Sequence, residues 1–135
     1  MYDSKECRLN DVAANMARSV EKALSYNEII KICINTKYSD GESWMDEVLA
    51  VSNANLHYIW DCWTKEYGKG GSYKLWPLNQ ISGIYIKYKP EGYKLSIWHN
   101  NANINIIVTS KVILENFLDV IQKYADVEID WPDKN

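Results

Sequence analysis

The sequence predicts an α+β fold, in which a mostly antiparallel, curved sheet carries helices packed on one face. Segments near both ends of the chain repeat apolar residues every three or four positions, which is typical of amphipathic helices. Between them lie β-branched runs and an alternating stretch around a Pro-Glu-Gly turn, which favour antiparallel strands. The 135 residues, 47% of them hydrophobic, suffice for one core, so we expect a single domain over residues 1–135.

The first half of the chain is expected to combine three helices with one strand. Residues 9–25 have a helical apolar stripe, and residues 29–36 are β-branched and predict a strand. Residues 38–42 read as a turn, followed by a helix over 44–51. A further helix is expected over 55–68, because its large apolar residues have helical spacing. That stripe consists of Leu56, Ile59, Trp60 and Trp63.

A hairpin is the clearest feature of the second half. After a flexible loop at 69–72, residues 81–89 alternate between apolar and polar and predict a strand. Residues 90–92 form the turn, and residues 93–99 return as the partner strand. Residues 100–103 are expected to be a loop.

The C-terminal part is expected to contain one helix and one short strand. Residues 104–124 are mostly apolar, and their second half has helical spacing. The helix begins either at Thr109 or Ser110, or earlier, near Asn103. Residues 127–131 predict a last strand before a polar tail.

The charge distribution favours an anionic ligand for the middle of the chain. The net charge is −3, which argues against a strongly basic DNA-binding domain. Residues 65–94, however, hold six lysines against two glutamates, between acidic ends. A solvated lysine-rich sheet face explains the same pattern, and both explanations stay open.

Several functional classes find no support in the sequence. No apolar run is long enough for a membrane span, and residues 1–10 are too polar for a signal peptide, so we expect a cytoplasmic protein without membrane contact. Three scattered cysteines and two histidines predict reduced thiols and neither metal nor cofactor. No nucleophile motif is present, so we expect no enzyme. Abundant Asn, Ile, Lys and Tyr suggest an AT-rich genome, as in many viruses, phages and some bacteria.

The aromatic content points to binding. Six Trp and ten Tyr accompany a single Phe. Trp and Tyr rings are rigid and amphipathic, and they stack on nucleobases. Trp60, Trp63 and Trp98 also fit a core position, so each ring has a structural as well as a binding interpretation.

Residues 79–98, with the sequence NQISGIYIKYKPEGYKLSIW, resemble a hairpin of the mRNA cap-binding translation initiation factor 4E family. In that pattern a glycine opens a strand that ends at a basic residue, and a glycine turn leads into Lys-apolar-small-Ile-Trp. The matching helix and terminal strand extend the resemblance to residue 131. The resemblance implies a shortened, divergent version of that cap-binding fold. The positions that carry it are Gly83, Lys89, Gly92, Lys94 and Trp98.

This resemblance also implies roles for single residues. Lys89 and Lys94 would bind the phosphates of the cap, and Trp98 would lie beside the methylated base. Trp60 and Asp61 resemble the Trp-acid pair that stacks on the base and pairs with its edge. The family has this pair in a loop, whereas the periodicity predicts a helix there.

The resemblance further includes Trp44. The segment 38–49 resembles the family's helix whose Trp docks a helical peptide of a partner protein, which makes Trp44 a candidate partner-binding residue.

The function expected first is therefore non-catalytic binding of an RNA 5′ cap or related nucleotide, with capped RNA as partner. The alternative is a toxin-neutralising immunity protein that binds a basic toxin domain through residues 40–47 or the acidic C-terminal residues. A small hydrolase using scattered acids and His99 is a third reading. The acidic C-terminal residues are Asp126, Glu128, Asp130 and Asp133.

Overall fold

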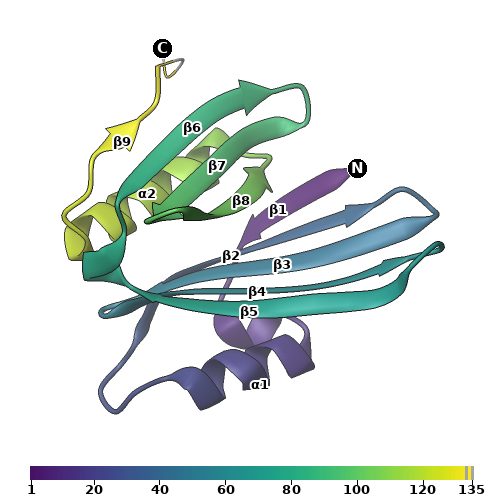
Figure 1. Ribbon diagram of the computed structural model, residues 1–135, viewed down its shortest axis with the longest axis horizontal. Coiled ribbons are helices and arrows are strands. Elements are labelled where there is room, and N and C mark those ends of the chain that lie inside the picture. Colours follow the sequence, from purple (N-terminus) through teal and green to yellow (C-terminus); the bar gives the residue numbers. More distant parts are fainter. Residues whose placement is uncertain (133, 135) are drawn as a thin grey trace.

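The computed structural model describes residues 1–132 and 134, which form two sheets and two α-helices (Figure 1). The first sheet is five-stranded, in the order β1-β2-β3-β4-β5, and the second is four-stranded, in the order β8-β7-β6-β9. All neighbouring strands are antiparallel except β6 and β9, which are parallel. The predicted α+β class and its mostly antiparallel pairing are confirmed.

The five-stranded sheet and α1 use the first 77 residues. The element bounds there are β1 Tyr2–Glu6, the 3₁₀ turn η1 Leu9–Asp11, α1 Ala14–Ala23, β2 Ile30–Ser39, β3 Ser43–Ser52, β4 Asn55–Thr64 and β5 Gly68–Pro77. The four-stranded sheet and α2 follow. Their bounds are η2 Leu78–Gln80, β6 Gly83–Lys89, β7 Gly92–His99, β8 Ala102–Val108, α2 Lys111–Tyr124 and β9 Ile129–Asp130.

The two helices cover opposite faces of the five-stranded sheet, so the expectation that they pack on one face is wrong. In Figure 1, α1 lies below this sheet, whereas α2 and β6–β8 lie above it. On the α2 side Phe117 and Leu49 belong to the main core, and on the α1 side Met16 and Val48 belong to a smaller one. The physical reason lies in β3, where residues 48–51 are all fully buried. A strand that is apolar on both faces needs cover on both sides.

Two of the predicted helices are strands. Residues 44–51 and 55–68 were expected to be helical, but they form β3 and β4, and the predicted loop at 69–72 belongs to β5. In β4 successive side chains point to opposite faces, and both faces are buried through residues 56–59. The two-residue alternation is therefore hidden, and helical spacing of apolar residues arises by coincidence.

Local signals were correct elsewhere. The helical stripe at 9–25 is η1 followed by α1, the β-branched run at 29–36 lies in β2, and the turn at 38–42 joins β2 to β3. The hairpin at 81–99 is β6 and β7, paired up to Lys89 and Gly92.

The helix near the C-terminus begins at Lys111, which decides between the two starts left open. Ser110 is its cap, since the Ser110 Oγ accepts from the Ile113 N–H at 3.3 Å. The preceding apolar residues form β8, and the expected last strand is reduced to β9.

Strand β8 crosses the face of the five-stranded sheet that lies on the α2 side. At its start, the Asn103 carbonyl oxygen accepts from the Lys74 ammonium of β5 at 3.5 Å. At its end, the hydroxyls of Ser4 in β1 and Thr36 in β2 lie 3.2 and 3.0 Å from the carbonyl oxygen of Ile107. These contacts connect the edge strand of the second sheet to both edges of the first.

Across the described residues, no helix combines the length and the hydropathy required to span a membrane.

Candidate ligand-binding face

Side chains on one face of the four-stranded sheet point away from the core. Directly opposite residues of antiparallel strands project to the same side, so the strand register defines this face. Ile86 and Leu95, on the other face, are buried. We call the face that points away from the core the outer face of the four-stranded sheet. It consists of Gly83, Tyr85, Lys87, Lys94, Ser96, Trp98, Asn103, Asn105 and Ile107.

Two lysines lie directly opposite each other on this outer face. Lys87 of β6 pairs in register with Lys94 of β7, and Lys89 follows on β6 at the end of the hairpin. Within residues 1–132 and 134, none of the three forms an ion pair. The acidic positions nearest in the strand order are Asp130, beside Tyr85, and Glu91 in the turn. Like charges directly opposite destabilise a sheet, so the pair favours an anion above it.

A fourth cation reaches the border of the outer face from the five-stranded sheet. The Lys74 ammonium contacts the carbonyl of Asn103, which is paired with Trp98. The same ammonium lies 5.9 Å from the centre of the Trp76 ring, within the range of a cation–π contact. The basic middle segment found in the sequence thus contributes lysines from both sheets.

Aromatic surface adjoins these cations. Trp98 is half-buried and Tyr85 is 48% exposed. The Tyr85 side chain lies over Gly83, since a β-carbon added to Gly83 would be 3.0 Å from both the Cε2 atom and the hydroxyl oxygen of Tyr85. Gly83 is itself paired with Trp98. The outer face therefore offers two rings on which a planar base can stack, next to a row of cations.

The side chains of the predicted pair Trp60 and Asp61 lie on opposite faces of the sheet. Both residues lie in β4, so the Trp60 position is neither the helix that the periodicity predicts nor the loop that the resemblance implies. Neighbouring strand residues project to opposite faces. Trp60 accordingly packs against the main core, while Asp61 lies opposite Asp46 on the α1 face. One base cannot contact both side chains.

The carboxyl group beside Trp60 is instead that of Glu47, which sequence reasoning missed. Glu47 is directly opposite Trp60 in the β3–β4 register and only 3% exposed. Burial raises the pKa of Glu47 to about 7, against the lowering effect of a hydrogen bond from the Tyr58 hydroxyl. A single Glu in an otherwise apolar run, residues 47–51, was the sequence signal that could have found it.

Trp44 lies on a strand rather than on a helix. It is directly opposite Trp63, and each ring is 37% exposed. Next to them, Asp46 and Asp61 face each other across the same two strands. The Asn35 amide donates to the Asp46 carboxylate at 2.6 Å. Trp44, Asp46, Asp61 and Trp63 form what we call the tryptophan–aspartate patch.

The remaining predicted acidic residues do not converge. Asp126, Glu128 and Asp130 are exposed, and Asp133 lies outside the described residues. Asp40 accepts hydrogen bonds from the N–H groups of Glu42 and Ser43 within its own turn. In the part of the chain that the structure describes, no three His, Cys, Asp or Glu side chains are arranged to hold a metal ion.

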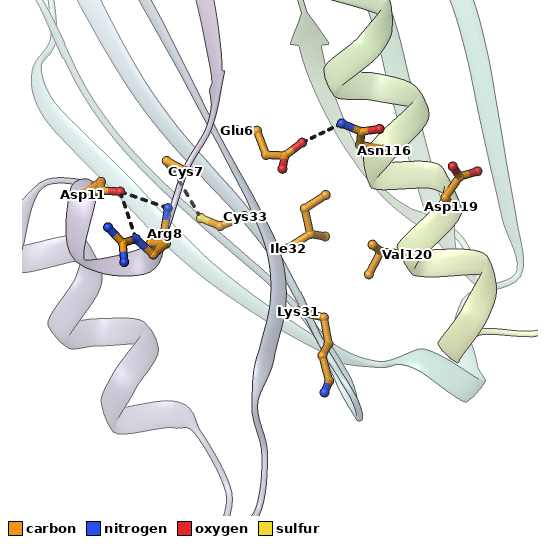
Figure 2. Close-up of a pocket in the computed structure, with 10 residues that line it drawn as sticks. All are labelled: Glu6, Cys7, Arg8, Asp11, Lys31, Ile32, Cys33, Asn116, Asp119 and Val120. Atoms are coloured by element: carbon orange, nitrogen blue, oxygen red, sulfur yellow. Dashed lines mark hydrogen bonds and ion pairs between the residues drawn. The ribbon is translucent and has the colours of Figure 1, made fainter.

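A separate pocket of about 640 Å³ lies between β1, β2 and α2 (Figure 2). Its walls include Cys7, Lys31 and Cys33 from the five-stranded sheet side and Asn116 and Asp119 from α2. None of the residues expected to bind a ligand lines it. It therefore does not belong to the outer face described above.

No family model and no curated protein matches this sequence. Among solved structures, a DUF1696 family protein with a pleckstrin-homology domain from Shewanella loihica PV-4 superposes with a TM-score of 0.61. The two sequences are 13% identical, over 91% of this chain and 97% of that one. The hSac2 domain from the human phosphoinositide phosphatase Sac2 superposes with a TM-score of 0.58 at 16% identity, over 90% and 88%. At such identities the likeness shows a shared fold and no more.

Proposed function

We propose that this protein is a non-catalytic module that binds a nucleotide, such as an RNA 5′ cap, on the outer face of the four-stranded sheet. The observation that carries this proposal is the directly opposed pair Lys87 and Lys94, which has no carboxylate partner among the described residues. Two ammonium groups carried by directly opposite residues attract phosphate more strongly than either alone.

The proposed binding mode divides the ligand between the two ends of β7. Lys87, Lys89 and Lys94 bind phosphates near the hairpin turn. Trp98 lies four residues further along β7, roughly 13 Å away at about 3.3 Å per residue, so it contacts a different part of the ligand. Trp98, together with Tyr85, stacks on the base. The resemblance to the cap-binding family supports three of these positions, Lys89, Lys94 and Trp98.

A second phosphate-bearing ligand is suggested by the name of one protein of similar fold. One of the two solved structures belongs to a phosphoinositide phosphatase, so an inositol phosphate is the other phosphate-bearing ligand that a test must include. A nucleotide is favoured here because exposed aromatic surface adjoins the lysines, and base stacking uses such surface.

The absence of catalysis is part of the proposal. On the outer face the Ser96 hydroxyl donates its hydrogen to the Asn105 side-chain oxygen at 2.5 Å, so this hydrogen is already engaged in a hydrogen bond. His99, the candidate of the hydrolase reading, is hydrogen-bonded to Gln80 at 2.9 Å and lies against the Trp76 ring. These contacts favour structural roles for both side chains.

The decisive experiment is a Trp-fluorescence titration with 7-methyl-GTP, GTP and an inositol trisphosphate. We expect quenching by 7-methyl-GTP, and about tenfold weaker binding for Lys94→Ala and for Lys87→Ala, because each loses one charge-assisted contact. Lys22→Ala, in an exposed turn of α1, is the matched control and should bind normally.

The outcomes separate the possible ligands. Equal response to GTP would indicate a general nucleotide binder, and response to the inositol phosphate alone would replace the nucleotide by that headgroup. No response to any of the three at millimolar concentration, or an equal loss in Lys22→Ala, would contradict the proposal.

A second candidate function is favoured by a different observation, the tryptophan–aspartate patch. Half-exposed Trp rings beside carboxylates are suited to a basic protein surface, as the immunity-protein alternative requires. Trp44 is also the residue that the resemblance makes a candidate for docking a helical peptide. If this candidate is right, Trp44→Ala and Trp63→Ala should each weaken binding of a nine-arginine peptide. Tyr26→Ala, which removes a ring that is 96% exposed in a loop, should not. Equal binding by all three variants would count against it.

A further inference from the structure

Two cysteines meet where the edge strand β1 ends. The Cys7 N–H donates to the Cys33 carbonyl at 3.0 Å, one position beyond the last paired residues, Glu6 and Ile34. The two sulfur atoms are 3.9 Å apart. Opposed residues of antiparallel strands have α-carbons about 4.5 to 5.5 Å apart, which falls within the range that a disulfide accepts.

The pair is accessible from one side. Cys33 is only 1% exposed, whereas Cys7 is half-buried. Figure 2 shows both side chains at the wall of the 640 Å³ pocket, with the contact between their sulfur atoms drawn. A small reagent in that pocket therefore meets Cys7 first.

We propose that Cys7 and Cys33 are a redox modification site, at which a low-molecular-weight disulfide such as oxidised glutathione drives formation of a reversible Cys7–Cys33 disulfide. The proposal goes beyond ligand binding, since neither residue belongs to the outer face or to the tryptophan–aspartate patch.

The chemistry proceeds by two exchanges. The Cys7 thiolate attacks one sulfur of oxidised glutathione, so that a Cys7–glutathione bond forms and one glutathione thiolate leaves. Cys33 then loses its proton to solvent and attacks the Cys7 sulfur, which releases the second glutathione thiolate. In total the two protein thiols lose two protons and two electrons, and one oxidised glutathione becomes two reduced ones.

The order of attack follows from the surroundings of the two thiols. The hydrogen bond with Cys33 lowers the pKa of Cys7, which favours its thiolate. The same hydrogen bond, together with burial, raises the pKa of Cys33. Cys7 is thus the attacking residue and Cys33 the resolving one.

Oxidation would fix the edge strand. The sulfur atoms must approach from 3.9 Å to about 2.0 Å, a movement that the end of a five-residue edge strand can accommodate. The new bond closes a loop over residues 7–33, which contains α1. Such a closure restricts the unfolded chain, so the oxidised protein should unfold at higher temperature.

The test uses the full chain. It is equilibrated in glutathione buffers of increasing oxidised fraction, alkylated with iodoacetamide, digested and analysed by mass spectrometry. We expect a cross-linked peptide pair containing Cys7 and Cys33, reversed by dithiothreitol, while Cys62 is alkylated and serves as the internal control. The oxidised form should have an unfolding midpoint several degrees higher than the reduced form.

Variants make the outcome decisive. Cys62→Ser should still form the bond, and Cys7→Ser, which changes the more exposed partner, should abolish it and leave Cys33 protected from alkylation in the native state. A Cys7–glutathione adduct that never resolves, a bond that involves Cys62 instead, or no bond at any glutathione ratio would overturn the proposal.

Discussion

Two glutamates are buried in contact with the five-stranded sheet, yet their ionisation differs. Glu28, just before β2, is 8% exposed, and Glu47 in β3 is 3% exposed. The pKa of Glu28 is lowered to about 2, whereas that of Glu47 is raised to about 7. Burial by itself acts to raise the pKa of both glutamates, so a second effect must lower the pKa of Glu28.

Hydrogen-bond donors make the difference at Glu28. Burial is the largest single effect and acts to raise its pKa, but several donors together outweigh it. His57 Nε2 lies 2.7 Å from the carboxylate, and His57 Nδ1 lies 2.6 Å from the Tyr73 hydroxyl. An ionised carboxylate only accepts, so Nε2 carries the hydrogen. The other donors are the Ser52 hydroxyl at 2.5 Å, the Asn55 amide at 3.1 Å and the Ser25 N–H at 2.9 Å.

Glu47 has far fewer donors. Among the described contacts its carboxyl oxygens accept only from the Tyr58 hydroxyl, and Asp46 next to it adds a like charge. Burial therefore dominates. Two buried residues of the same type therefore have different roles. Glu28 is a charged structural anchor, while Glu47 gains or loses a proton near neutral pH beside Trp60.

The largest effect should follow from breaking the Glu28 anchor. His57 is fully buried, so His57→Ala removes a donor and leaves a buried carboxylate short of a partner. We expect a loss of roughly 3–5 kcal/mol in the free energy of unfolding at pH 7, measured by urea denaturation. A loss below about 1 kcal/mol would mean that the anchor contributes little.

Acid should weaken the same anchor. The folded-state pKa of Glu28 lies below its unfolded value of 4.5, so its stabilisation is present above pH 4.5 and is lost as pH falls towards 2. A shift of this size corresponds to roughly 3 kcal/mol. Urea denaturation at pH 3 and pH 6 should show about 2 kcal/mol of this loss in the native protein and a smaller loss in Glu28→Gln. Parallel pH profiles of stability for the native protein and Glu28→Gln would show that the Glu28 charge does not contribute to stability in this way.

Glu47 should show the opposite dependence. Its folded-state pKa of about 7 exceeds the unfolded value of 4.5, so its stabilisation is complete below pH 4.5 and is lost as pH rises through 7. Glu47→Gln keeps an acceptor for Tyr58 but no charge. We expect the variant to exceed the native protein in stability by up to about 2 kcal/mol at pH 8 and to match it near pH 4. A variant that is less stable at pH 8 would show that the ionised carboxylate is stabilised after all.

Part of the candidate site was predictable from the sequence. The spacing of Lys94 and Trp98 in one alternating strand sets them on one face, and the turn before them fixes the hairpin. Lys87 was missed as a site residue, although its position opposite Lys94 follows from the same hairpin register. Trp60 and Asp61 failed as a pair because they were read as neighbours in sequence, whereas strand geometry separates their side chains.

Local signals in the sequence are sufficient to predict two elements, the apolar stripe of α1 and the β6–β7 hairpin, whereas the choice of Ser110 as the cap of α2 came from the structure. Only the tertiary structure decided that β3 and β4 are strands, because cover from both sides makes their alternation disappear. It also decided which residues from distant segments meet. Glu47 with Trp60 and Cys7 with Cys33 are brought together by strand pairing, a long-range choice that depends on burying both faces of one sheet.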